Sequence, residues 1–167
     1  EPVSWFLTGM EKHSDRAEPE KFGDGELFFN TMRYNMAKLP ENALDAAMNQ
    51  LSNHDHSRFL TRTNRRAGRM KDGFDDAGIG IDYGLFRLAS MLLFTWPGAP
   101  TLFYGDEVGV YGWTEPDCRR PYPWGKEDLE LLEYHRYLIS HRKASPALKN
   151  GNLMLLKSGK NWVSYLR

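Results

Sequence analysis

The chain has 167 residues, close to the size of one ordinary domain. Lys and Arg together number 22, and so do Asp and Glu, so the formal net charge is zero. A neutral chain lacks the positive field that general nucleic-acid binding requires. Hydrophobic residues make up 41% and charged residues 26%, which is typical of a globular domain and excludes a disordered one. The single cysteine excludes an intrachain disulfide and a cysteine-only zinc site.

The longest apolar run, residues 88–96, is far shorter than the roughly 20 residues that span a bilayer. We therefore expect neither nucleic acid nor a membrane as a partner. The chain begins at Glu1 without a targeting segment and ends at Arg167 inside an expected strand, so we expect an excerpt of a longer polypeptide. The single cysteine favours the cytoplasm, and the localisation is otherwise open.

The first half of the chain predicts a loop, a helix and a short strand. Residues 11–24 are polar, and Asp24 is a residue type that caps helices. Apolar residues then recur at spacings of three and four up to Pro40, namely Phe28, Met32, Met36 and Leu39. The apolar segment 43–51 ends abruptly in the polar cluster 52–58. We therefore expect a strand there, although Ala and Met favour helices.

The second half predicts a β/α unit, a long loop, a helix and a hairpin. The basic stretch 61–80 reads as a solvated surface loop whose positive charge is balanced by aspartates. An amphipathic helix over about 85–95 precedes a buried strand at 101–104. A loop over 105–125 is long enough to suggest a site. The chain closes with a helix over about 127–141 and a hairpin of residues 153–156 and 162–166.

Strands that alternate with helices predict an α/β fold with parallel strands, in which functional loops lie at the carboxyl ends of the strands. Both expected strands end in polar residues: Asn53, His54, Asp55 and Arg58 follow the first, and the loop 105–125 follows the second. Carboxylates and imidazoles give directional hydrogen bonds to hydroxyl groups, and indole rings cover the apolar faces of sugars. We therefore predict a polyhydroxylated ligand.

Three segments resemble the alpha-amylase family of glycoside hydrolases. Asn53-His54-Asp55 is similar to the fourth signature region of the family, and residues 97–109 are similar to its eighth barrel strand and the following loop. Residues 115–119 resemble the Asp-Pro-Asp-Cys-Arg segment of its neopullulanase, cyclomaltodextrinase and maltogenic amylase members, with Glu115 in place of the usual Asp. The resemblance implies the last strands and helices of a (β/α)8 TIM barrel over residues 1–146. The start of an antiparallel β C-terminal domain would follow over residues 147–167.

The resemblance also implies an activity, which is hydrolysis or transfer of α-glucosidic bonds in maltodextrin-like substrates by a retaining mechanism. Asp55 would be the transition-state stabiliser that binds the hydroxyls at C2 and C3, and His54 would bind the same sugar. Glu115 and Arg119 would contact the next glucose units, with Asn53 and Arg58 as further substrate-binding residues. No cofactor or metal is implied.

The signature motifs of the nucleophile and the general acid are missing from the chain. A retaining glycosidase needs two carboxyl groups about 5 Å apart, and the adjacent residues Asp106 and Glu107 diverge at a strand end, so we expect them to be structural. We therefore expect residues 1–167 to be inactive without the preceding part of the same polypeptide. We also expect the exposed strand edges to favour self-association.

Three other interpretations stay open at this stage. His54 and Asp55 could cap the helix that follows them. The chain could be a non-catalytic carbohydrate-binding or structural module of barrel origin. A metal-dependent hydrolase could use His54, Asp55 and His56, although the remaining histidines lie on segments that we do not expect to converge, namely His13, His135 and His141.

Overall fold

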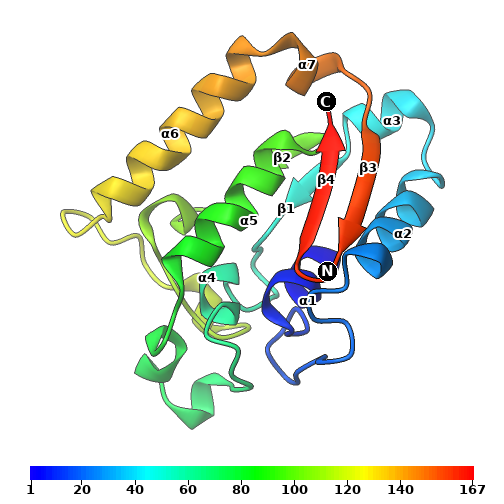
Figure 1. Ribbon diagram of the computed structural model, residues 1–167. Helices are drawn as coiled ribbons and strands as arrows, with labels where there is room; N and C mark the ends of the chain where they lie inside the picture. Colours follow the sequence, from blue (N-terminus) through cyan, green and yellow to red (C-terminus); the bar gives the residue numbers. More distant parts are fainter.

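The computed structural model describes residues 1–167 and contains both parallel and antiparallel strand pairs among its helices (Figure 1). The elements run in the order α1 (Pro2–Thr8), α2 (Gly25–Met36), α3 (Glu41–Asp45), β1 (Met48–Gln50), α4 (Phe59–Arg62), α5 (Tyr83–Thr95), β2 (Ala99–Thr101), α6 (Leu129–Ala144), α7 (Pro146–Asn150), β3 (Met154–Gly159) and β4 (Trp162–Leu166). Short 3₁₀ turns lie in the loops at Met70–Asp72, Asp75–Gly78, Asp106–Val108 and Asp117–Arg119. Each helix is too short or too polar to cross a membrane.

The predicted parallel β/α unit is confirmed. Strand β1 pairs in parallel with β2, with Met48 opposite Ala99 and Gln50 opposite Thr101, and α5 lies in the connection between them. Strand β2 begins two residues earlier than the sequence predicts, because the amide of Ala99 already binds the carbonyl of Ala47 at 2.8 Å. It ends at Thr101 because the ladder ends there, even though the apolar run continues.

Aspartate caps set the start of the three longest helices. Asp24, Asp82 and Asp128 each accept a hydrogen bond from the backbone N–H three residues later, at 2.8–2.9 Å. Such a cap is worth roughly 1 kcal/mol, because it satisfies an amide that has no partner inside the helix. The predicted start of α2 is therefore confirmed. Helix α6 continues to Ala144, three residues past its predicted end.

Three features of the first half differ from the sequence prediction. The expected strand over 43–51 is confirmed only for Met48–Gln50, because Glu41–Asp45 forms helix α3, in keeping with the helix propensity of its alanine and leucine. Helix α1 was not predicted, although Pro2 in its first turn and Gly9 in the left-handed conformation after its end are typical boundary residues. The stretch 61–80 is not wholly a surface loop, since Arg62 is buried in α4 and its guanidinium donates to the carbonyl of Leu51. Arg69, by contrast, forms an exposed ion pair with an aspartate of the 9–18 loop.

The core consists of two apolar clusters on either side of α5. One lies between α4, α5 and α6, and includes Phe59, Phe86, Leu93, Leu131 and Leu138. The other is largely aromatic and joins α1, α2 and the end of α5 through Trp5, Phe6, Phe28, Phe29 and Trp96. Packing in these two clusters holds α5 in place between the other helices. Since α5 connects the two parallel strands, this packing also helps to position the loops that follow them.

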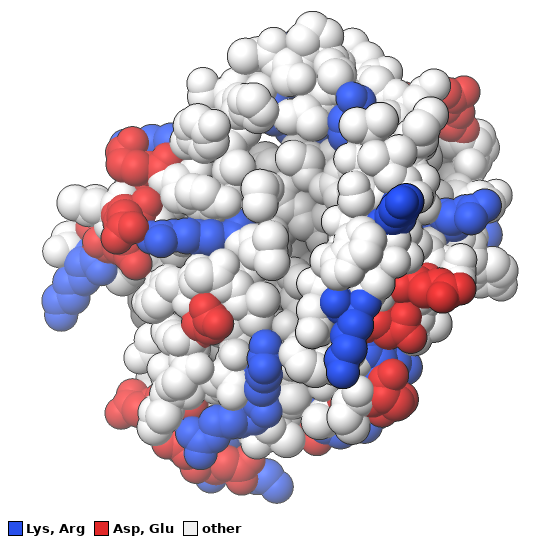
Figure 2. Space-filling view, in the orientation of Figure 1, with Lys and Arg blue, Asp and Glu red and all other residues white.

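The predicted hairpin is confirmed as the antiparallel pair β3 and β4, which lies beside α2 (Figure 1). The approach is close at Gly25, because a Cβ atom there would lie 2.5 Å from the carbonyl oxygen of Trp162 and 2.6 Å from that of Gly159. A largely apolar hollow of about 520 Å³ lies between β4 and α5 (Figure 2). Around it, positive and negative side chains are interspersed on this face, in keeping with the neutral composition (Figure 2).

Phe28 gives the first testable prediction. Its side chain is fully buried and its ring lies against the rings of Trp5, Phe6 and Trp96. We expect Phe28→Ala to lower the free energy of unfolding by about 3–5 kcal/mol, because the change leaves a cavity in the aromatic cluster. Tyr34→Ala, at an exposed position of the same helix, is the matched control and should change it by less than about 0.5 kcal/mol. Urea unfolding measures both changes, and an equal loss of unfolding free energy in the two variants would contradict this description of the core.

Candidate functional site

The two loops that follow the parallel strands meet, as the sequence predicts. The carbonyl of His54, in the first loop, accepts hydrogen bonds from Arg119 Nε at 3.1 Å and from the thiol of Cys118 at 3.2 Å, both in the second loop. One residue further on, the carbonyl of Asp55 accepts a hydrogen bond from the hydroxyl of Thr114 at 2.5 Å. Side chains that are far apart in the sequence therefore share one surface.

Asp55 and His54 point into solvent from this junction. Their side chains are 54% and 64% exposed, and His54 Nε2 lies 3.3 Å from Asp55 Oδ1. The capping interpretation is wrong, because no side chain caps α4 and the amide of Phe59 donates instead to the hydroxyl of Ser52. The Asp55 carboxylate is therefore free to accept hydrogen bonds from a ligand.

Asn53 shapes the turn that presents this pair. Its side-chain oxygen accepts hydrogen bonds from the amides of Asp55 at 2.9 Å and His56 at 3.0 Å. This is an Asx turn, in which the amide side chain replaces a backbone carbonyl and fixes the loop locally.

Glu115 and Arg119 provide the opposite side of the surface. Their ion pair spans 2.7 Å, and the two side chains are 52% and 45% exposed. Because the pair is half exposed it contributes little to stability, but its remaining donors and acceptors are open to a polar ligand. The residues at this junction are called the polar surface below, namely Asn53, His54, Asp55, Glu115 and Arg119.

Arg58 does not lie on that surface. Its side chain is fully buried, and its Nη1 lies 2.9 Å from Asp106 Oδ1. Burial raises the pKa of Asp106, and the positive charge of Arg58 opposes that rise. A buried guanidinium cannot contact a ligand at the surface. The predicted structural placement of Asp106 agrees with this pair.

Sequence reasoning missed the contribution of the 9–18 loop. His13 Nδ1 lies 2.9 Å from the hydroxyl of Thr114, and the His13 ring meets the His56 ring edge to face at 4.9 Å between centroids. Ser14 and Ser57 add a hydroxyl–hydroxyl contact of 2.8 Å. The expectation that His13 stays away from the His54–His56 segment was wrong, because only tertiary packing brings the two loops together.

A metal site has no support in this arrangement. Nowhere in residues 1–167 do three His, Cys, Asp or Glu side chains converge as metal ligands would. Burial, followed by the charges of Arg62, Lys12 and His13, lowers the pKa of His56 to about 4.

The aromatic residues of the second loop divide into two kinds. Trp113 is buried and its indole N–H donates to the carbonyl of Gly73, so it packs the loop. Trp124 is 81% exposed, and its ring lies 4.4 Å from that of Tyr122. Of the two indole rings, that of Trp124 is the one open to a ligand.

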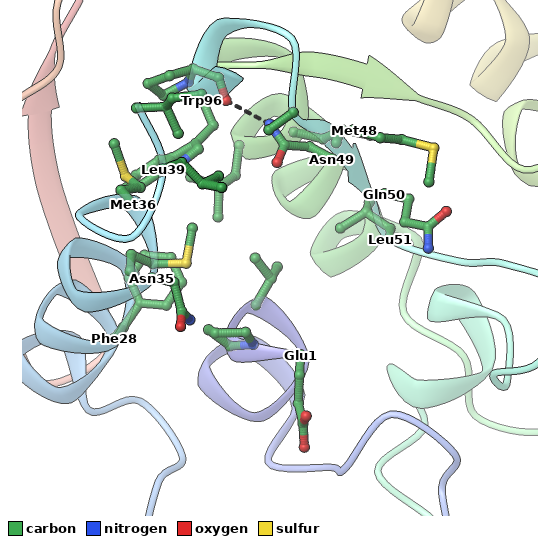
Figure 3. Close-up of a pocket in the computed structure, with 18 residues that line it drawn as sticks. Glu1, Phe28, Asn35, Met36, Leu39, Met48, Asn49, Gln50, Leu51 and Trp96 are labelled. Atoms are coloured by element: carbon green, nitrogen blue, oxygen red, sulfur yellow. Dashed lines mark hydrogen bonds between the residues drawn. The ribbon is translucent and has the colours of Figure 1, made fainter. Parts of the chain in front are cut away.

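The chain also has an apolar cavity of about 330 Å³ that is separate from the polar surface (Figure 3). It lies between α1, α2, β1 and the end of α5, and its labelled residues include Phe28, Met48 and Trp96. Asn49 closes one end by donating to the carbonyl of Pro97 at 2.6 Å. None of the predicted site residues lines this cavity.

Comparison with known proteins gives a consistent result. The family model described as "Alpha amylase, catalytic domain" matches residues 5–128. Neopullulanase 2 of Thermoactinomyces vulgaris is 34% identical over 153 residues, which cover 90% of this chain and 21% of that protein. A cyclomaltodextrinase of a Bacillus species is 31% identical over 151 residues, covering 88% of this chain and 24% of that protein. The chain thus spans between a fifth and a quarter of these relatives.

Solved structures agree with these sequence matches. The debranching enzyme of Nostoc punctiforme superposes with a TM-score of 0.75 at 26% identity, over 98% of this chain and 32% of that structure. A cyclomaltodextrinase superposes with a TM-score of 0.71 at 28% identity, over 99% of this chain and 25% of that structure.

His56 gives a prediction on pH dependence. Its pKa in the folded chain, about 4, lies below the ordinary value near 6.5, so between these values the unfolded chain binds more protons. The free energy of unfolding should therefore fall as the pH is lowered from about 6.5 to 4. We expect His56→Gln to flatten this dependence, measured by urea unfolding at several pH values. His141→Gln, on an exposed part of α6, is the control, and a matching flattening there would contradict the prediction.

Proposed function

This chain belongs to the alpha-amylase family, and from that premise we propose that it is part of a glycoside hydrolase that cleaves or transfers α-glucosidic bonds in maltodextrin-like substrates. The observation that carries the proposal is the junction of the two loops, where His54 and Asp55 face Glu115 and Arg119. The named relatives, a neopullulanase and a cyclomaltodextrinase, support the same substrate class.

We propose that residues 1–146 are the last strands and helices of a (β/α)8 barrel and that residues 147–167 begin a separate β domain. Strand β1 pairs only with β2, so its other edge is unpaired. Met48 and Gln50 on β1 are exposed, as expected for side chains that face the interior of an incomplete barrel. The hairpin β3–β4 is antiparallel and lies outside the matched residues 5–128, in keeping with a new domain.

Asp55 is assigned as the transition-state stabiliser. When a glycosidic bond breaks, the sugar ring flattens and becomes positively charged, so hydrogen bonds from the ring hydroxyls to a carboxylate grow stronger. The backbone of Asp55 is held by an Asx turn and by the hydrogen bond from Thr114 to its carbonyl, so the exposed carboxylate is presented from a fixed position before the substrate arrives. Less of the substrate's binding energy is then needed to order this residue, so more of it lowers the barrier.

The neighbouring side chains hold the rest of the substrate. His54, 3.3 Å from Asp55, binds the same sugar with its imidazole. Glu115 and Arg119 bind adjoining glucose units, since their ion pair leaves acceptors and donors exposed. Asn53 contributes by shaping the turn, because its side-chain oxygen is already engaged with two amides.

The two carboxyl groups that perform the bond cleavage belong to other strands of the proposed barrel. Retaining hydrolysis needs a nucleophile and an acid about 5 Å apart. Asp106, an acid in the loop after β2, is buried against Arg58 and cannot serve. We therefore propose that residues 1–167 alone bind an α-glucan weakly and do not cleave it.

The role of Asp55 is tested by Asp55→Asn in the longer polypeptide that contains residues 1–167. We expect kcat on maltodextrins to fall by about 10²- to 10³-fold, because the neutral amide cannot match a developing positive charge. The unfolding temperature should stay unchanged, since the carboxylate is exposed.

Asp45→Asn, at an exposed position of α3, is the matched control and should retain full activity. A near-normal kcat for Asp55→Asn would overturn the assigned role. If the longer polypeptide without any substitution has no activity on α-glucans, the result would instead favour a non-catalytic carbohydrate-binding module.

The unpaired edge of β1 gives a further prediction. Residues 1–167 on their own should self-associate, because the strand edge and the adjacent apolar cavity have no cover. Sedimentation or light scattering should detect dimers or larger species at micromolar concentration. Met48→Lys places a charge beside that edge and should shift the chain toward the monomer. A compact monomer for the unchanged chain would contradict the proposal of an incomplete barrel.

A further inference from the structure

The buried guanidinium of Arg58 contacts two separate parts of the second loop, near residues 103–106 and at residue 118. Its Nε donates to the carbonyl of Cys118 at 2.8 Å, and its Nη1 donates to the carbonyl of Tyr104 at 2.6 Å and to Asp106 Oδ1 at 2.9 Å. The guanidinium carbon also lies 3.9 Å from the centre of the Phe103 ring. A single side chain from the first loop therefore binds the start and the middle of the second.

These contacts lead directly to the polar surface. Cys118, whose carbonyl Arg58 holds, donates its own thiol to the carbonyl of His54, and the next residue, Arg119, donates to the same oxygen. The backbone of Arg58 adds a bond from its amide to the carbonyl of Gly112 at 2.9 Å. A shift of the guanidinium would thus move Arg119 relative to His54.

We propose that Arg58, paired with Asp106, is a positioning residue that sets the distance between the His54–Asp55 pair and the Glu115–Arg119 pair. This inference rests on the proposed function, and it replaces the earlier assignment of Arg58 to direct substrate binding. Only arginine fits the role, because three acceptors surround it and a planar guanidinium presents fixed donors to all of them. Lysine keeps the charge but is a compact point charge without that geometry.

A double-mutant cycle tests the proposal in the longer polypeptide. Arg58→Lys should lower kcat/KM on maltotriose by about 10- to 100-fold, because displacements near 1 Å cost rates of this order. In a background that already carries Arg119→Ala, the same change should cost less than about 3-fold, because the contact that it displaces is gone. Equal losses in the two backgrounds would show that Arg58 acts on overall stability alone and would overturn the proposal.

Arg142→Lys is the matched control. Arg142 also donates to three carbonyls, those of Phe94, Trp96 and Gly98, but it joins α6 to the end of α5 and the turn before β2. Its substitution should lower the unfolding temperature without coupling to Arg119→Ala. Coupling as large as that of Arg58→Lys would contradict a specific role for Arg58.

Two further measurements keep the proposal testable on other grounds. If Arg58→Lys does not fold, Asp106→Asn replaces it in the same cycle, since the amide keeps an acceptor but loses the ion pair.

Amide hydrogen exchange on residues 1–167 tests the positioning role without an activity assay. Arg58→Lys or Asp106→Asn should speed exchange at 115–119, whereas Arg142→Lys should speed exchange at 94–98. Unchanged exchange at 115–119 would overturn the positioning role, whereas inactivity of the unchanged longer protein would contradict only the proposed function.

Discussion

A fully buried positive charge is the constraint around which this part of the molecule is organised. Arg58 can stay buried only because an aspartate and two carbonyl groups surround it, since an unpaired charge in the interior is very costly. Those partners all belong to the loop that follows β2. The loop therefore cannot move away from the end of β1 without leaving the guanidinium and Asp106 without partners.

This buried pair also explains how an exposed polar surface can be well ordered. Asp55, His54, Glu115 and Arg119 are all about half exposed or more, and exposed ion pairs alone hold side chains weakly. The order comes from the hydrogen bonds that the side chains of Thr114, Cys118 and Arg119 donate to backbone carbonyls of the first loop. A glycosidase gains from such an arrangement, because a preorganised carboxylate favours the charged transition state over the neutral substrate.

Much of this could be predicted from local patterns in the sequence. Asp24 as a cap, the amphipathic α5 and the hairpin near Asn161 each depend on a few neighbouring residues, and the structure confirms them. The convergence of Asn53–Asp55 with 115–119 could be predicted because parallel strands place their ends at one edge. Long-range packing could not be predicted in the same way. The burial of Arg58 and Arg62 and the approach of His13 to Thr114 leave no periodic signal in the sequence.

The central claim is that the Asp55 carboxylate faces the sugar ring that becomes positively charged. A crystal structure of the longer polypeptide with an acarbose-type pseudo-oligosaccharide tests this most directly, because the unsaturated ring of the inhibitor imitates the flattened sugar. We expect both Asp55 oxygens within about 2.5–3.0 Å of hydroxyls on that ring. An inhibitor whose unsaturated ring lies far from Asp55 would contradict the claim.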